Sequence, residues 1–258
     1  MGSGVPAIID ISLTLVSGGE RPITARQLQA AVVSAVEVGH HSQINAYSAW
    51  PLMQGSTRDL ALRVGWLPDT QPPAGLTEAG RSWWFGSPAH PRVAAQTAQA
   101  RLTAADYEMI SDTPPVRASR FTFHSPTLFK RSGQRRYPLP DPHLVFRGLA
   151  EKWNTFTTCR PITPEHLSAL TNSLEVAECD IRTELMVKGR QGVRRPRDNR
   201  AATPADAAMT GFVGSVTFAL APKTPHDVGQ LLASLSTFAN FAGVGYATTS
   251  GFGACETS

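Results

Sequence analysis

The strongest break in the sequence is the tetrapeptide Asp112-Thr113-Pro114-Pro115, close to the middle of the 258 residues. Proline lacks a backbone N–H, fixes φ and forces the preceding residue toward extended backbone. Neither a helix nor a central strand is therefore expected to run through this segment. The predicted order of elements, strand–helix–strand–strand, starts again after it. We therefore predict two domains of similar size, residues 1–114 and 115–258.

The first half begins with an apolar, β-branched run at residues 7–16, which is typical of a buried strand. A helix is predicted to start after Thr24, because threonine is a favoured N-cap residue and Gln27 stands at the capping-box position. Two further strands are predicted at residues 44–52 and 59–67, the second from its alternating apolar residues. Weaker patterns predict a short helix at residues 76–84 and a strand at residues 107–110.

The second half repeats this order with more strongly marked helices. Asp141-Pro142 and Thr163-Pro164 each combine a favoured N-cap residue with proline at the first helical position. A last helix is predicted to start at Thr224-Pro225. Strands are predicted at residues 120–124, 174–187 and 211–220, with a closing strand from the glycine-rich C-terminal tail. This order predicts an α+β protein built from two tandem ferredoxin-like (RRM-like) domains, the second ending in a glycine-rich loop.

The composition is that of a globular protein with a packed core, since hydrophobic residues make up 41% and charged residues 17%. No apolar run approaches the roughly 18 residues of a membrane span. Asp10 interrupts the early apolar run that a signal peptide would need. The 3 cysteines are widely spaced and form no Cys/His cluster, which argues against a zinc site or a disulfide framework. We expect a cytoplasmic protein that contacts no membrane.

The formal charge of +4 is compatible with a polyanionic partner but does not establish one. Arginine, which makes bidentate contacts to phosphate and stacks on bases, supplies most of the 24 basic residues. A GC-rich genome would bias codon usage toward arginine in the same way, so both explanations stay open. The lysines are Lys130, Lys152, Lys188 and Lys223.

The most distinctive part of the sequence is its glycine-rich segment near the C-terminus, GVGYATTSGFG at residues 243–253. Closely spaced glycines let the backbone approach a partner and present N–H groups to phosphates. A dinucleotide-binding fingerprint does not fit, because Thr248 stands at the third glycine position and no helix follows. A Walker loop does not fit either, because the segment has no lysine. Spacing alone leaves a flexible tail as the alternative. As a nucleic-acid site, the segment offers the contact residues Gly243, Gly245, Tyr246, Thr248, Thr249, Gly251 and Gly253.

Three parts of the sequence resemble the CRISPR-associated RAMP superfamily. The glycine-rich segment, preceded by Phe238-Ala239-Asn240-Phe241, is similar to the C-terminal signature of that superfamily. More narrowly, the chain resembles the endoribonuclease that cuts precursor CRISPR RNA. The segments that carry this second resemblance are Phe123-His124-Ser125-Pro126-Thr127 with Leu139-Pro140-Asp141-Pro142, and Tyr47-Ser48-Ala49-Trp50-Pro51-Leu52. The resemblance covers most of the chain, is weakest over residues 68–105, and implies two ferredoxin-like domains with CRISPR repeat RNA or crRNA as partner.

His40 and His41 are the candidate catalytic residues, with His41 preferred. From the residues alone they would lie in a solvent-exposed loop between the first helix and a strand. The resemblance implies a catalytic role, because many members of the family carry the catalytic histidine in that place. An imidazole titrates near neutrality, so it could act as a base at an RNA 2′-OH or as an acid at the leaving 5′-oxygen. Because no carboxylate or Cys/His cluster stands out, we expect cleavage without a metal ion or other cofactor, giving 2′,3′-cyclic phosphate and 5′-hydroxyl ends.

The sequence departs from better-known members of this family, which can complete the site with a tyrosine of the first helix and a nearby lysine. Residues 25–38 contain no tyrosine, and the first half contains no lysine. Arg26, Arg58 or Arg63 could instead stabilise the charge of the transition state. The other explanation is a weak catalyst that works mainly by positioning the scissile phosphate.

A basic run, KGRQGVRRPRDNR at residues 188–200, lies between two predicted strands of the second half. Taken alone, it is a solvated basic turn. The resemblance implies that it contacts the phosphates of the repeat hairpin, with strong salt dependence. Its candidate RNA-binding residues are Lys188, Arg190, Arg194, Arg195, Arg197 and Arg200.

The sequence therefore predicts a metal-independent endoribonuclease that binds the CRISPR repeat stem-loop and cleaves precursor CRISPR RNA by 2′-OH attack to yield mature guide RNA. Such an enzyme could also associate with other subunits of a CRISPR effector complex. The alternative is a non-catalytic RAMP subunit that only binds guide RNA. The loop histidines favour the enzyme, and the missing tyrosine and lysine favour the binder.

Overall fold

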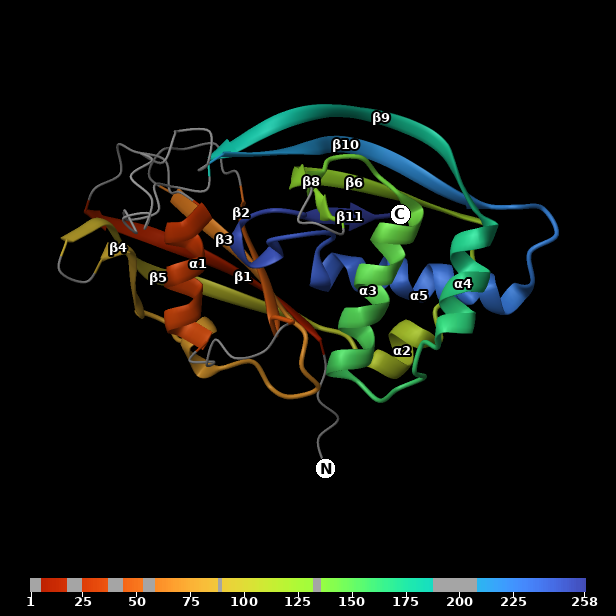
Figure 1. The fold of residues 1–258 in the computed structure, drawn as a ribbon. Coiled ribbons are helices and arrows are strands. Elements are labelled where there is room, and N and C mark those ends of the chain that lie inside the picture. The colour runs from red at the N-terminus through yellow and green to blue at the C-terminus, as the bar shows by residue number, and fades with distance from the viewer. Residues whose placement is uncertain are drawn as a thin grey trace, which may run out of the picture.

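The computed structural model describes residues 6–17, 25–36, 44–52, 59–87, 90–131, 136–187 and 208–258. It is a mixed α/β structure whose strands pair in antiparallel fashion (Figure 1). None of the helices in these segments is long and apolar enough to cross a membrane.

The first half forms a five-stranded sheet with strand order β2-β3-β1-β5-β4. Ile9 and Ile11 of the central strand β1 are fully buried and share one core with Leu28 and Val32 of the helix α1. The alternation of apolar and polar residues in β1 therefore sets which face of this sheet the helix covers. The elements are β1 (Ala7–Ser17), α1 (Ala25–Val36), β2 (Tyr47–Leu52), β3 (Asp59–Trp66), β4 (Ser82–Ser87) and β5 (His90–Ala104).

The second half forms a four-stranded sheet with strand order β11-β6-β10-β9, and its helices lie together on one side of that sheet (Figure 1). The long strands β9 and β10 arch over β6 toward the first half. The short strands β7 (Phe129–Lys130) and β8 (Arg136–Tyr137) pair with each other. The remaining elements are β6 (Ala118–Thr127), α3 (Pro142–Phe156), α4 (Pro164–Ser173), β9 (Leu174–Val187), β10 (Ala208–Leu220), α5 (His226–Ala242) and β11 (Cys255–Thr257).

The starts of α3 and α4 confirm the predictions made from their N-cap residues. The Asp141 carboxylate accepts a hydrogen bond from the Leu144 N–H at 3.3 Å. The Thr163 hydroxyl accepts one from the His166 N–H at 3.3 Å, and the His166 ring accepts one from the Thr163 N–H at 3.5 Å. Each cap uses only neighbours within the first helical turn, which is why the sequence could predict it.

Two sequence predictions in the first half are wrong. Residues 76–84 form no helix; a 3₁₀ turn at Ala74–Leu76 is followed by β4. Residues 107–110 form no strand but belong to α2 (Tyr107–Ser111), which Asp106 caps. The spacing of Tyr107 and Ile110 places both on one side of that helix turn, where they are buried in the core of the second half.

The two halves pack directly on each other where the end of α5 meets β2 and β3. The Ser48 hydroxyl donates a buried hydrogen bond of 2.6 Å to the carbonyl oxygen of Phe241. Beside it, a Cβ at Gly65 would overlap the same carbonyl oxygen, so glycine is needed for this close approach. This contact brings the C-terminal end of α5 to the edge of the first sheet.

Candidate functional site

The glycine-rich loop, residues 243–253, links α5 to β11. Gly243, Gly245, Gly251 and Gly253 have φ angles of 60°, 87°, 87° and 70°, a region that side chains with a Cβ disfavour. A Cβ at Gly245 would lie 2.5 Å from the carbonyl oxygen of Leu128. These glycines are therefore required by the path of the backbone, independently of any ligand.

Backbone hydrogen bonds fix the loop against both halves. The Val244 N–H donates to the Gly253 carbonyl at 2.9 Å, and the Tyr246 N–H donates to the Leu128 carbonyl at 2.8 Å. The Gly251 N–H donates to the Ala49 carbonyl of β2 at 2.9 Å. The loop thus has a defined conformation and connects the two halves, which excludes the flexible-tail interpretation.

Hydroxyl groups on the loop connect it to α1. Thr248, Thr249 and Ser250 are buried. The Ser250 hydroxyl donates to Gln29 Oε1 at 2.9 Å, and Gln29 Nε2 donates to the Thr249 hydroxyl at 3.4 Å. A single glutamine side chain therefore links the first helix to the loop.

A cavity of about 390 Å³ lies between α1, α3 and the glycine-rich loop. Ile44 and Asn45, which precede β2, complete its wall. Its lining is rich in hydroxyl, amide and charged groups, which suits a polar ligand better than an apolar one. The residues around it are Gln29, Ile44, Asn45, Gly148, Glu151, Lys152, Gly245, Tyr246, Ala247, Thr248, Thr249 and Ser250.

Lys152 of α3 lies in the wall of this cavity. Its ammonium group donates to the carbonyl oxygens of Ala242 and Gly243 at 2.7 and 3.1 Å and to the Thr248 hydroxyl at 3.3 Å. Part of the residue is exposed, but the ammonium group is buried, and burial lowers the pKa of Lys152 to about 8. Burial also raises the pKa of the neighbouring Cys255 thiol to about 12, so that thiol is neutral at physiological pH.

The predicted loop residues divide into two groups. Gly245, Tyr246, Thr248 and Thr249 line the cavity, whereas Gly243, Gly251 and Gly253 shape the loop without lining it. The predictions missed Lys152, Gln29 and Asn45. Their positions depend on contacts between segments far apart in the chain, and no local pattern signals them.

Several predicted residues lie outside the described part of the chain. They are His40 and His41, and in the basic run Lys188, Arg190, Arg194, Arg195, Arg197 and Arg200. Arg58 also lies outside it, as does the side chain of Arg26.

Arg63, a candidate for transition-state stabilisation, is engaged elsewhere. Its Nε lies 2.6 Å from an oxygen of Asp10 on the neighbouring strand β1, and its Nη1 lies 3.4 Å from Glu256 of β11. Arg63 therefore connects the two sheets through carboxylates. Its neighbour Val64 belongs to the core beneath α1, so Arg63 faces the opposite side of the sheet from α1.

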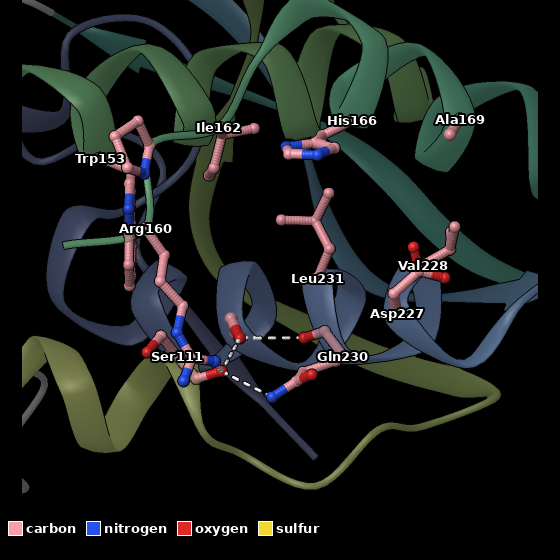
Figure 2. Close-up of a pocket in the computed structure, with 12 residues that line it drawn as sticks. Ser111, Trp153, Arg160, Ile162, His166, Ala169, Asp227, Val228, Gln230 and Leu231 are labelled. Carbon is pink, nitrogen blue, oxygen red and sulfur yellow. Dashed lines mark hydrogen bonds between the residues drawn. The ribbon is translucent and has the colours of Figure 1, made fainter.

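A second cavity, of about 200 Å³, lies among the helices of the second half (Figure 2). Apolar side chains such as Trp153, Ile162 and Leu231 form much of its wall. On its floor, the Ser111 carbonyl accepts hydrogen bonds from Gln230 Nε2 at 3.0 Å and the Ser234 hydroxyl at 3.3 Å. The lining of this cavity is more apolar than that of the cavity at the loop, so it is less suited to a charged ligand.

Within the described segments, no group of three or more His, Cys, Asp and Glu residues is placed to hold a metal ion.

The family comparison matches residues 121–255 to the model described as "CRISPR-associated endoribonuclease Cas6". That region contains most of β6, the helices α3 to α5 and the whole glycine-rich loop. The chain belongs to the Cas6 family.

Relatives agree with this assignment. The CRISPR-associated endoribonuclease Cas6 of Mycobacterium tuberculosis (strain ATCC 25618 / H37Rv) is 27% identical over 141 residues. The match takes in 55% of this chain and 39% of that relative's length, so it spans well under half of the curated protein.

Solved Cas6 structures share the fold. The Cas6 (TTHB231) product complex matches with a TM-score of 0.74 at 22% identity and covers 99% of this chain and 100% of that one. Thermus thermophilus Cas6 (TTHB231) matches with a TM-score of 0.66 at 21% identity, over 100% of both chains. At this level of identity the match establishes the Cas6 fold over nearly the whole chain.

Proposed function

We propose that this chain is a metal-independent endoribonuclease that binds the CRISPR repeat stem-loop and cleaves precursor CRISPR RNA to yield mature guide RNA. Membership of the Cas6 family supports this proposal, because the family model and the curated relatives carry the name of that endoribonuclease. The similar solved structures include a Cas6 product complex and a substrate mimic complex.

The observation that carries the proposal is the cavity of about 390 Å³ between α1 and the glycine-rich loop. Ile44 and Asn45 line it, and His41 precedes Ile44 by three positions in the sequence. The histidine pair and the loop thus belong to one site in this proposal.

The proposed reaction breaks one bond and forms one bond at phosphorus. A base removes the proton of the 2′-OH, the 2′-oxygen attacks the adjacent phosphorus, and the bond to the 5′-oxygen breaks as that oxygen accepts a proton. His41, or its neighbour His40, would supply the base or the acid. Those backbone N–H groups of the glycine-rich loop that do not hold the loop in place would bind the phosphate and oppose the charge of the transition state.

We further propose that both halves are ferredoxin-like domains, residues 1–114 and 115–258. The strand order β11-β6-β10-β9, with helices between β6 and β9 and between β10 and β11, supports this for the second half. The order β2-β3-β1-β5 supports it for the first half, in which β4 lies between β3 and β5 in the chain, where a second helix would be expected. The basic run at residues 188–200 would contact the RNA stem by its phosphates, in the cytoplasm where the transcript is made.

The test is cleavage of a synthetic repeat RNA in the presence of EDTA, comparing the intact protein with an H40A/H41A double variant. The H143A variant serves as the matched control, because His143 is exposed on α3 and lines neither cavity. An RNA with 2′-deoxy at the scissile nucleotide tests the nucleophile. We expect cleavage by the intact protein and H143A, and none by the double variant or of the deoxy RNA, while binding persists.

Other outcomes would change the assignment. Tight binding without cleavage by the intact protein would favour a non-catalytic RAMP subunit that binds guide RNA within an effector complex. Cleavage that requires added divalent ions would contradict the metal-independent mechanism. Equal cleavage by the double variant would retain the enzyme and reject both histidines.

A further inference from the structure

We infer that Lys152 is a positioning residue for the proposed cleavage, holding the end of α5 and the glycine-rich loop in the shape that receives the scissile phosphate. This inference rests on the proposed function, and it assigns a role to a lysine of the second half. The proposal concerns how the loop is held, and it leaves the proton transfers to other groups.

The geometry around the ammonium group supports this role. Its hydrogen bonds go to the carbonyl of Ala242, the last residue of α5, to that of Gly243, which starts the loop, and to the hydroxyl of Thr248 inside the loop. Helix carbonyls at a C-terminus lack partners within the helix and carry partial negative charge, so a cation is favoured there. One side chain therefore holds both the start of the loop and its 3₁₀ turn, Thr248–Ser250, against α3.

The contacts continue from Lys152 to the first half. Thr248, which Lys152 holds, is followed by Thr249 and Ser250, and both of these hydrogen-bond to Gln29 of α1. α1 ends at Val36, shortly before His40 and His41 in the sequence. A change in the position of Thr248 would therefore be transmitted to the helix that leads into the histidine pair.

The charge of Lys152 is not cancelled by the groups that it contacts. Its described hydrogen-bond partners are two carbonyl oxygens and a hydroxyl, all of them uncharged. Cys255 of β11 faces it as a neutral thiol. Glu151 of α3 lines the same cavity, but it is exposed and lies 3.5 Å from Arg147. The positive charge thus remains available to stabilise a phosphate in the cavity.

The pH dependence of the cleavage rate provides a readout that a purely structural role of Lys152 would not change. Since burial lowers its pKa to about 8, the side chain loses its charge and one of its three N–H donors as the pH rises through that value. Arginine keeps its charge throughout this range. We therefore expect the alkaline decline of the cleavage rate to depend on the residue at position 152.

The experiment compares the intact protein with K152M, K152R and the control variant K223M. K223M removes one positive charge from an exposed position in the turn before α5. Single-turnover cleavage of the repeat RNA is measured from pH 6.5 to 9.5. Hydrogen–deuterium exchange of the peptide covering residues 243–254 is measured at neutral pH without RNA. Circular dichroism and thermal unfolding establish that each variant is folded.

We expect K152M to cleave about tenfold or more slowly than K223M, since it loses hydrogen bonds from a charged donor. Its loop peptide should exchange faster, and K152R should recover part of the rate and move the alkaline decline to higher pH. Rates and exchange in K152M equal to those of K223M would overturn the inference, as would an unchanged alkaline decline in K152R. If K152M fails to fold, the pH dependence of cleavage by K152R tests the inference instead. If the intact protein binds but does not cleave, the proposed function fails, and the exchange comparison still decides whether Lys152 holds the loop.

Discussion

Replacing Gly253 by alanine should destabilise the protein by about 3 kcal/mol. Gly253 has φ of 70°, and an added Cβ would lie 2.9 Å from the Val244 carbonyl carbon and closer still to its oxygen. The left-handed backbone costs alanine about 1 kcal/mol. The collision forces the backbone apart, and this breaks the hydrogen bonds from Val244 N–H to Gly253 at 2.9 Å and from Gly253 N–H to Pro126 at 3.2 Å. Each is worth about 1 kcal/mol.

The matched control is G80A. Gly80 has φ of 75°, almost the same as Gly253, but an added Cβ meets nothing within 4 Å. This variant should lose only about 1 kcal/mol of stability, the cost of the left-handed backbone. Urea unfolding of both variants gives the difference directly, and we expect about 2 kcal/mol between them. Equal losses would refute the argument that packing of the loop, beyond its backbone angles, requires glycine.

Three further variants test other contacts. S48A removes the buried hydrogen bond of 2.6 Å to the Phe241 carbonyl, so thermal unfolding should show a loss of about 1–2 kcal/mol; an unchanged midpoint would remove this contact from the interface between the halves. D141A should lose about 1 kcal/mol of stability by urea unfolding, whereas D141N retains the cap and most of the stability; equal losses would contradict the capping role. The Cys255 thiol has its pKa raised from 9.0 to about 12 in the folded protein, so it stays protonated there while the unfolded chain ionises. Its contribution to stability is therefore complete below about pH 9 and is lost as the pH rises toward 12, and C255A should show a shallower alkaline decline than the intact protein.

Helix starts and strand patterns illustrate what local sequence can predict. The caps at Asp141 and Thr163 involve residues within one turn, and both helices begin where the sequence indicated. Strand β9 occupies the predicted residues 174–187. In contrast, the sequence predicts a strand where α2 forms, since the apolar residues of so short a segment fit the period of a strand or of a helix. Burial of its side chains in the core of the other half favours the helix over the strand.

For the site, the sequence by itself determined that a glycine-rich segment ends the second half. The backbone freedom that glycine provides is a local effect, and the spacing of the glycines can be read directly from the sequence. Only the tertiary structure decided what the loop contacts. Hydrogen bonds link Ser250 to Gln29 and Gly251 to Ala49, pairs separated by about 200 residues or more. Lys152 acquires its role for the same reason. Its environment comes from the end of α5 and from the loop, whereas the pattern alone would place a lysine of an amphipathic helix in solvent.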